Sequence, residues 1–90
     1  GLVKAVYSIG DAEAEVIEAQ VLGTSSLAGQ AVRDIKWPKG SILGVIKING
    51  ETLIPKGDTK IQEGALITIF ALSKDIPDIE AMLQVGVDFF

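Results

Sequence analysis

The chain has 90 residues, of which 48% are hydrophobic, and a formal net charge of −4 at pH 7. The length predicts one domain. The hydrophobic content predicts more apolar side chains than the core of so small a domain can hold. The acidic balance argues against binding to nucleic acid or to an anionic membrane, because both depend on clustered Lys and Arg, and no apolar run approaches the ~20 residues of a membrane span. The chain has no Cys and no His, which excludes disulfides and thiolate chemistry and removes the commonest general base and metal ligand, so we expect neither an enzyme nor a metal site.

Residues 2–8 and 13–22 are predicted to form the first two strands. The first segment is rich in β-forming residues, and Gly10 and Asp11 supply a turn after it. The second segment is ambiguous, because its Ala, Glu and Gln residues favour a helix whereas its polar and apolar positions partly alternate, as in a strand. We interpret it as a strand that pairs with the first, and a helix remains the alternative.

A short helix is predicted between these strands and Pro38. Ser25 or Ser26 provides an N-cap for a helix that begins near Leu27. Gln30 stands near the third helical position, as the partner in a capping box would. The helix has to end before Pro38, because the residue before a proline avoids the α region.

Three further strands are predicted in the second half of the chain. Residues 41–48 are nearly all apolar or β-branched. Residues 51–54 return across Asn49-Gly50, a dipeptide typical of a type I′ hairpin turn. Residues 65–72 form the most apolar strand, which we expect at the centre of the sheet, and residues 60–61 are expected to pair briefly.

A final helix is expected after residues 73–75, which cap it, and Gly86 is expected to end it. Pro77 suits the first helical turn. The buried stripe of this helix is predicted to comprise Ile76, Ile79, Met82 and Leu83.

Together these elements predict an α+β domain with two layers, a mostly antiparallel sheet and two short helices, in the order β-β-α-β-β-β-α. One domain is expected to span residues 1–90. Within it, residues 1–12 form a linker or the first strand and turn, and residues 86–90 form a C-terminal tail. Phe89 and Phe90 in this tail are expected to dock, either onto this domain or onto a partner.

The one basic cluster of the sequence lies in residues 33–39. Arg33, Lys36 and Lys39 lie close to Trp37 in the sequence, and such a combination of cations with an aromatic ring could bind an anion or a nucleotide phosphate. The alternative, which the residues alone favour, is a helix end stabilised by cations near its C-terminus and a Trp that packs over the sheet edge. The candidate ligand-binding residues are Arg33, Asp34, Ile35, Lys36, Trp37 and Pro38.

An ordered set of short motifs covers nearly the whole chain. Its members are residues 3–8 (VKAVYS), 15, 17–19 (IEA), 26–30 (SLAGQ), 34–35 (DI), 38–40 (PKG), 42–46 (ILGVI), 49–50 (NG), 54–59 (IPKGDT), 61, 64, 66–70 (LITIF) and 89–90 (FF). This set resembles the TrkA C-terminal domain, also called the RCK C-terminal domain, a regulatory module of bacterial potassium uptake systems. The end of the chain is similar to the end of the second repeat of a two-repeat TrkA.

The resemblance implies a role rather than a chemistry. It implies a cytoplasmic, homodimeric regulatory domain that is peripheral at the inner face of the plasma membrane through contact with a potassium transporter subunit. It implies no cofactor in this domain, since NAD or ATP is expected only on the N-terminal Rossmann domain of the family. Some members bind cyclic di-AMP between two such domains, around the segment that matches residues 34–38, where an Arg often stands in the position of Lys36.

Two alternatives to this role remain open at the level of the sequence. The same module serves other carriers, such as a cation/proton antiporter or an anion permease. The domain would also fit a nucleotide-binding sensor in its own right.

Overall fold

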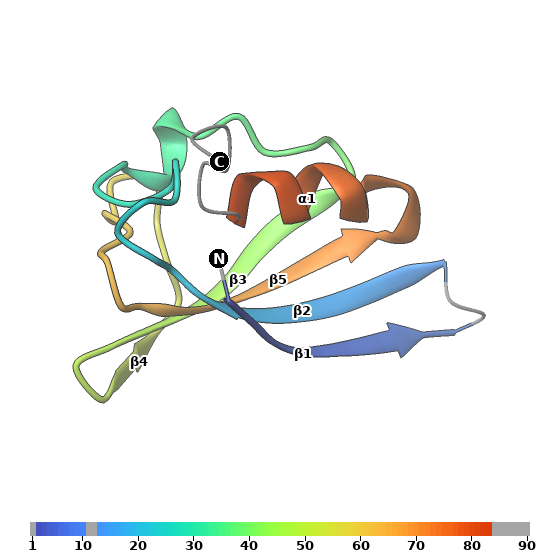
Figure 1. Ribbon diagram of the computed structural model, residues 1–90, viewed down its shortest axis with the longest axis horizontal. Helices are drawn as coiled ribbons and strands as arrows, with labels where there is room; N and C mark the ends of the chain where they lie inside the picture. The colour runs from blue at the N-terminus through green and yellow to red at the C-terminus, as the bar shows by residue number, and fades with distance from the viewer. Residues whose placement is uncertain (1, 11–12, 84–90) are drawn as a thin grey trace.

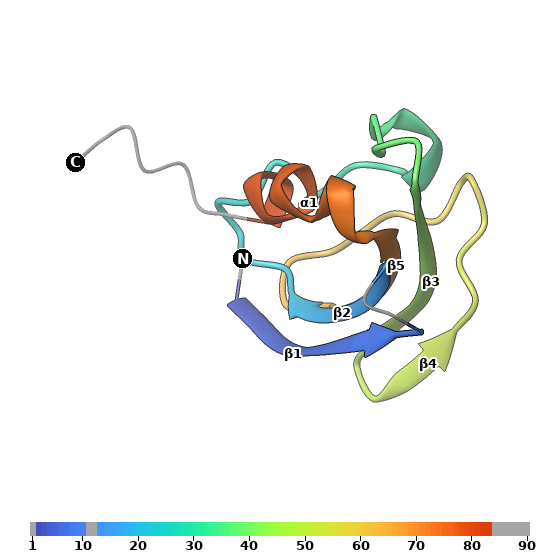
Figure 2. The same ribbon diagram turned by 90° about the vertical axis from the view of Figure 1, so that its right-hand side faces the viewer.

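The structure, a computed structural model, describes residues 2–10 and 13–83 (Figure 1). These residues contain five antiparallel strands and one α-helix, together with two 3-10 turns and the loops that connect them. The sheet forms one layer and the helix the other, as Figure 2 shows from the side. This arrangement confirms the predicted two-layer α+β class. The elements are β1 (Leu2–Ile9), β2 (Ala14–Gln20), the 3-10 helix η1 (Val32–Asp34), β3 (Ser41–Ile48), β4 (Glu51–Leu53), β5 (Leu66–Leu72), the 3-10 helix η2 (Ser73–Asp75) and α1 (Ile76–Leu83).

The sheet has the strand order β1-β2-β5-β3-β4, and each pair of neighbouring strands is antiparallel. The strand β5 therefore lies in the middle, as predicted for the most apolar strand. Its side chains alternate between the two faces of the sheet. Ile67, Ile69 and Ala71 are buried, whereas Phe70 and Leu72 are exposed.

The helix α1 covers one face of the sheet with the predicted apolar stripe. Ile79 and Leu83 are fully buried, and Ile76 and Met82 pack against the same core. Residues 73–75, predicted as a cap, form the 3-10 turn η2 that leads into the helix. The predicted helix end at Gly86 and the docking of Phe89 and Phe90 fall outside the described residues.

Residues 14–20 form a strand, which settles the ambiguity between strand and helix. The strand β2 pairs with β1 on one side and with β5 on the other, with Ile17 opposite Ile69. Ile17 and Ala19 are buried between these neighbours. Pairing on both sides and burial of the apolar face therefore outweigh the helical propensity of Ala, Glu and Gln.

The first predicted helix is much shorter than expected. Residues 24–29 form turns, and helical geometry is limited to the single 3-10 turn η1. Gly29 adopts a positive φ of 86°, which interrupts a right-handed helix. The backbone instead bonds to a distant segment, because the Gly29 N–H donates to the Ile61 carbonyl over 2.7 Å and the Ile61 N–H donates to the Gln30 carbonyl over 2.9 Å.

The expected brief pairing around residue 60 is confirmed as a single bridge between Ala31 and Lys60. The hairpin between β3 and β4 is also confirmed. Asn49 and Gly50 have φ angles of 52° and 79°, the positive values that a type I′ turn requires.

Replacing Gly50 with Ala is expected to lower the free energy of unfolding by about 1 kcal/mol, because an L-residue is strained at this φ. A Cβ at this position would meet no atom within 4 Å, so the cost is conformational rather than steric. Urea denaturation of both proteins measures it. Gly57→Ala is the matched control, since its φ is not positive and its Cβ would lie at ordinary contact distance, 3.5 Å, from Cβ of Arg33. Equal losses in the two variants would contradict a turn-specific effect.

Candidate functional site

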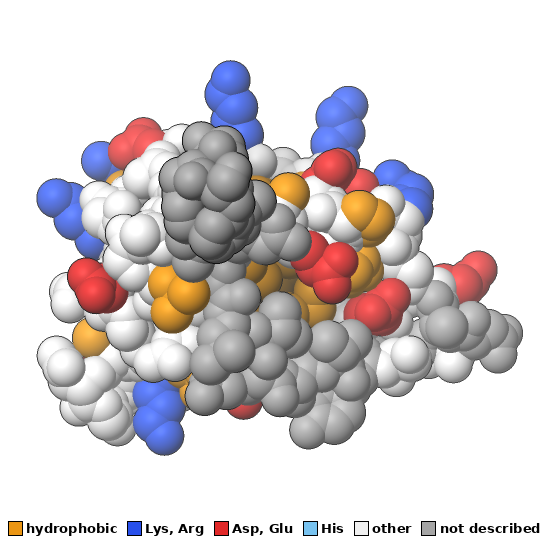
Figure 3. All heavy atoms as spheres, in the orientation of Figure 1, with side chains coloured by type: hydrophobic (Ala, Val, Ile, Leu, Met, Phe, Trp, Pro, Cys, Tyr) orange, Lys and Arg blue, Asp and Glu red, His pale blue; other side chains and the backbone are white. Residues whose placement is uncertain are grey.

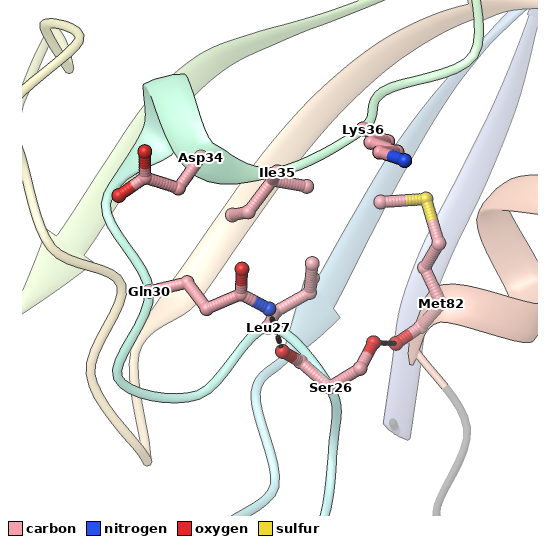
Figure 4. A pocket seen from close by; sticks show the side chains of 7 residues that line it. All are labelled: Ser26, Leu27, Gln30, Asp34, Ile35, Lys36 and Met82. Atoms are coloured by element: carbon pink, nitrogen blue, oxygen red, sulfur yellow. Dashed lines mark hydrogen bonds between the residues drawn. The ribbon is translucent and has the colours of Figure 1, made fainter.

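A pocket opens where three parts of the chain meet: the turn of residues 25–30, the segment after η1, and the end of α1 (Figure 4). Its volume is about 330 Å³, within the range of small-molecule sites. Leu27 and Ile35 are its buried apolar side chains, with only 1% and 8% of their surface exposed. The other lining residues are Ser26, Gln30, Asp34, Lys36 and Met82.

One acidic and one basic side chain lie at the rim of this pocket. Figure 4 shows Asp34 and Lys36 at opposite ends, with Ile35 between them. Both charged residues are exposed. The pocket therefore offers an ammonium group for an anion, a carboxylate for a hydrogen-bond donor and an apolar surface for a ring.

Two serines tie the turn to the end of α1. The Ser25 hydroxyl donates to the Met82 carbonyl over 3.0 Å and accepts from the Leu27 N–H over 3.2 Å. The Ser26 hydroxyl donates to the same carbonyl over 3.4 Å. The Met82 carbonyl is among the last four of the helix, which have no partner within it. These bonds therefore cap the helix and hold Met82 at the wall of the pocket.

The side chain of Gln30 bonds back to the turn that carries it. Its amide Nε2–H donates to the Ser26 carbonyl. This closes residues 26–30 into a compact loop, which together with the Ile61 bonds fixes the position of the pocket rim.

The segment after η1 is held mainly by residues that do not line the pocket. The Trp37 Nε1–H donates to the Val32 carbonyl over 3.1 Å. The Pro38 carbonyl accepts from the Ser41 hydroxyl over 2.7 Å. The Gly40 N–H donates to Oδ2 of Asp75 over 3.1 Å. The segment is thereby tied to its own start, to β3 and to η2.

The six candidate residues divide into two groups. Asp34, Ile35 and Lys36 line the pocket, whereas Arg33, Trp37 and Pro38 do not. The Arg33 N–H donates to the Gly57 carbonyl over 2.9 Å, which ties this residue to the turn after β4. Trp37 and Pro38 are half-buried and support the segment.

Four lining residues carried no signal for a ligand site in the sequence. Ser26 and Gln30 resemble capping residues, and Leu27 and Met82 resemble core residues. Ser26 and Met82 are also 56 positions apart in the chain, so no local pattern could bring them together. Their proximity depends on where α1 ends over the sheet.

Basic and acidic side chains are mixed on the face seen in Figure 3. Lys and Arg side chains project singly around its rim, and acidic side chains lie between them, so this face has no patch of one charge. Within residues 2–10 and 13–83, no group of three or more acidic side chains is placed to hold a metal ion. No helix in this part of the chain is long and apolar enough to cross a membrane.

The TrkA-C domain family model matches residues 16–84. The Trk system potassium uptake protein TrkA of Azorhizobium caulinodans is 38% identical over 90 residues, which are 100% of this chain and 20% of that protein. The protein of the same name from Halomonas elongata is 35% identical and covers 94% of this chain, again 20% of its own length. Trk system potassium uptake protein TrkA homolog 2 of Methanosarcina mazei is 33% identical, with 91% of this chain and 18% of that protein covered. The chain thus spans about a fifth of the length of these relatives.

A solved structure described as "Structure of RCK domain with cda" has a similar fold. Its TM-score is 0.66 at 20% sequence identity, and the match covers 77% of this chain and 97% of that one. At this identity the likeness concerns the fold alone.

Proposed function

Because the chain belongs to the TrkA-C domain family, we propose that it is the dimerising, ligand-sensing regulatory domain of a Trk-type potassium transport system. In this role it works in the cytoplasm and couples to a membrane-embedded potassium transporter subunit. The names of the relatives support potassium uptake over an antiporter or a permease as the regulated system. The family is a regulatory rather than a catalytic one.

The observation that carries the sensing part of the proposal is the pocket of about 330 Å³. It brings three of the predicted ligand residues, Asp34, Ile35 and Lys36, together with the end of α1. We propose a nucleotide as its ligand. Lys36 would pair with a phosphate, and the apolar side chains of Ile35 and Met82 would contact the base.

The bonds of Ser25 and Ser26 suggest how the bound state is transmitted. A ligand in the pocket contacts Ser26 and Met82, which are themselves joined through the Met82 carbonyl. Ligand contact therefore stiffens the connection between the turn and the last turn of α1. Any segment that follows α1 would respond to this change.

A thermal-unfolding screen against cyclic di-AMP, ATP, ADP, NADH and Ca²⁺ tests the proposal. A ligand present at ten times its Kd adds about 1.4 kcal/mol to the free energy of unfolding, and each kcal/mol raises the Tm of a domain of this size by roughly 4–8 °C. We expect a rise with a nucleotide and none with Ca²⁺. The absence of any rise across the panel would contradict ligand sensing by this domain.

Two variants locate the site. Lys36→Ala is expected to abolish the rise in Tm, because it removes the only Lys or Arg among the lining residues. Arg33→Ala is the matched control and is expected to retain the rise, since Arg33 lies three positions away but does not line the pocket. If Arg33→Ala abolished the rise in Tm and Lys36→Ala retained it, the ligand would bind next to Arg33, beside the turn after β4, and not in the pocket.

A further inference from the structure

The single sulfur atom of the chain lies in the wall of the pocket. The sequence has no Cys and one Met, and this residue, Met82, lines the pocket. Its side chain is half-buried, so solvent reaches part of it. Its backbone is held in place, because the hydroxyls of Ser25 and Ser26 donate to its carbonyl. A chemical change at the thioether therefore acts directly on the pocket wall.

The Met82 side chain points toward the one basic side chain of the pocket. Figure 4 shows it extending from the end of α1 along the wall toward Lys36. The one ion pair among the described residues joins Lys74 and Asp75, so no carboxylate holds the Lys36 ammonium there. A thioether sulfur is only a weak hydrogen-bond acceptor. The reduced Met82 therefore leaves this ammonium available to a phosphate.

A hydroperoxide changes this property of Met82. With hydrogen peroxide, a lone pair of the sulfur attacks one peroxide oxygen, and the S–O bond forms as the O–O bond breaks. The proton of the transferred hydroxyl passes to the departing hydroxide, which leaves as water. The sulfur loses the two electrons that the peroxide gains, and the product is a polar sulfoxide. Its oxygen accepts the hydrogen bond that the thioether scarcely accepts.

We propose that Met82 is a redox modification site that controls the pocket. In the oxidised chain, the sulfoxide oxygen accepts a hydrogen bond from the Lys36 ammonium and so competes with the phosphate of the ligand. The same oxygen replaces part of the apolar surface that a base would contact. The inference rests on the proposed ligand-sensing function and adds to it regulation by hydroperoxides. Because reductases return methionine sulfoxide to methionine, this regulation is reversible.

Oxidation of the folded chain with dilute hydrogen peroxide tests the site without a ligand. Intact-mass spectrometry is expected to show one added oxygen atom in the parent and none in Met82→Leu, a substitution that nearly conserves volume. Lys36→Ala is expected to move the ¹³C-methyl resonance of Met82 more in the oxidised chain than in the reduced chain, because only the sulfoxide bonds to the ammonium. An unreactive Met82, or equal shifts in the two chains, would overturn the proposal.

Calorimetric titration with cyclic di-AMP, ATP, ADP and NADH tests the regulation. Oxidation is expected to raise the Kd of the nucleotide that binds about tenfold, the equivalent of one hydrogen bond to a charged group. Treatment with the two methionine sulfoxide reductases, one for each epimer, is expected to restore the Kd. The bound nucleotide is also expected to slow the oxidation of Met82, since it covers the same wall.

The double variant M82L/I54M is the matched control. It moves the single methionine to position 54, where 73% of the native side chain is exposed and which does not line the pocket. This variant is expected to take up one oxygen atom with no change in Kd on oxidation. A parent that binds a nucleotide equally well before and after oxidation would overturn the regulation and leave ligand sensing standing. A parent that binds no nucleotide in either form would overturn both.

Discussion

Replacing Ile69 with Ala is expected to lower the free energy of unfolding by about 2–5 kcal/mol. Ile69 has no exposed surface and lies in the central strand, opposite Ile17 of β2 and Leu43 of β3. Truncation removes buried methyl and methylene groups and leaves a cavity in the middle of the core. For a domain whose total stability is about 5–15 kcal/mol, this is a large fraction, and the Tm should fall by roughly 10–30 °C.

The measurement is urea denaturation followed by the fluorescence of Trp37, the single tryptophan of the chain. The same substitution at Ile54 provides the control, since 73% of that side chain is exposed, and its effect should stay within about 0.5 kcal/mol. Similar losses at both positions would show that β5 does not occupy the centre of the core.

Replacing Ser25 with Ala is expected to lower the free energy of unfolding by about 2–3 kcal/mol. Only 5% of Ser25 is exposed, and its hydroxyl serves the Leu27 N–H and the Met82 carbonyl at once. Its removal leaves a buried donor and a helix-end carbonyl without this partner, and each such loss costs about 1–3 kcal/mol. Thermal unfolding monitored by circular dichroism measures the effect.

Ser26→Ala is the matched control for Ser25. Ser26 is exposed, and its bond to the Met82 carbonyl is long at 3.4 Å, so its loss is expected to cost less than about 0.5 kcal/mol. If Ser26→Ala were the more damaging change, the assignment of Ser25 as the buried link between the turn and α1 would be wrong.

The sheet was predictable because its signals are local and agree with one another. The dipeptide Asn49-Gly50 favours one turn type, the type I′ turn. Residues 65–72 are nearly all apolar, and a strand at the edge of the sheet would leave too many of these side chains in solvent. The strand β2 was ambiguous because its composition favours a helix, and its pairing with β5, far along the chain, decides the outcome. The first helix was overpredicted for a similar reason, since the bonds of Gly29 and Gln30 to Ile61 are invisible to local propensity.

The candidate site was only partly predictable. The basic cluster pointed to a segment of which three of the six candidate residues line the pocket, and a ligand role for them stays a prediction. Arg33 was included because charge is visible in a sequence, whereas the direction of a side chain from a 3-10 turn is not. Met82 could not be assigned, because a methionine in an apolar helical stripe has the same pattern whether it lies over the core or at a pocket wall.

Met82 offers the most direct test of the central claim that the pocket is a ligand site. It is the single methionine of the chain and it lines the pocket, so the ¹³C-methyl methionine spectrum reports on this site alone. Titration with the nucleotide that raises the Tm is expected to shift this resonance to saturation, and Lys36→Ala is expected to prevent the shift. A compound that raises the Tm while the Met82 resonance stays in place would bind elsewhere and would contradict the account.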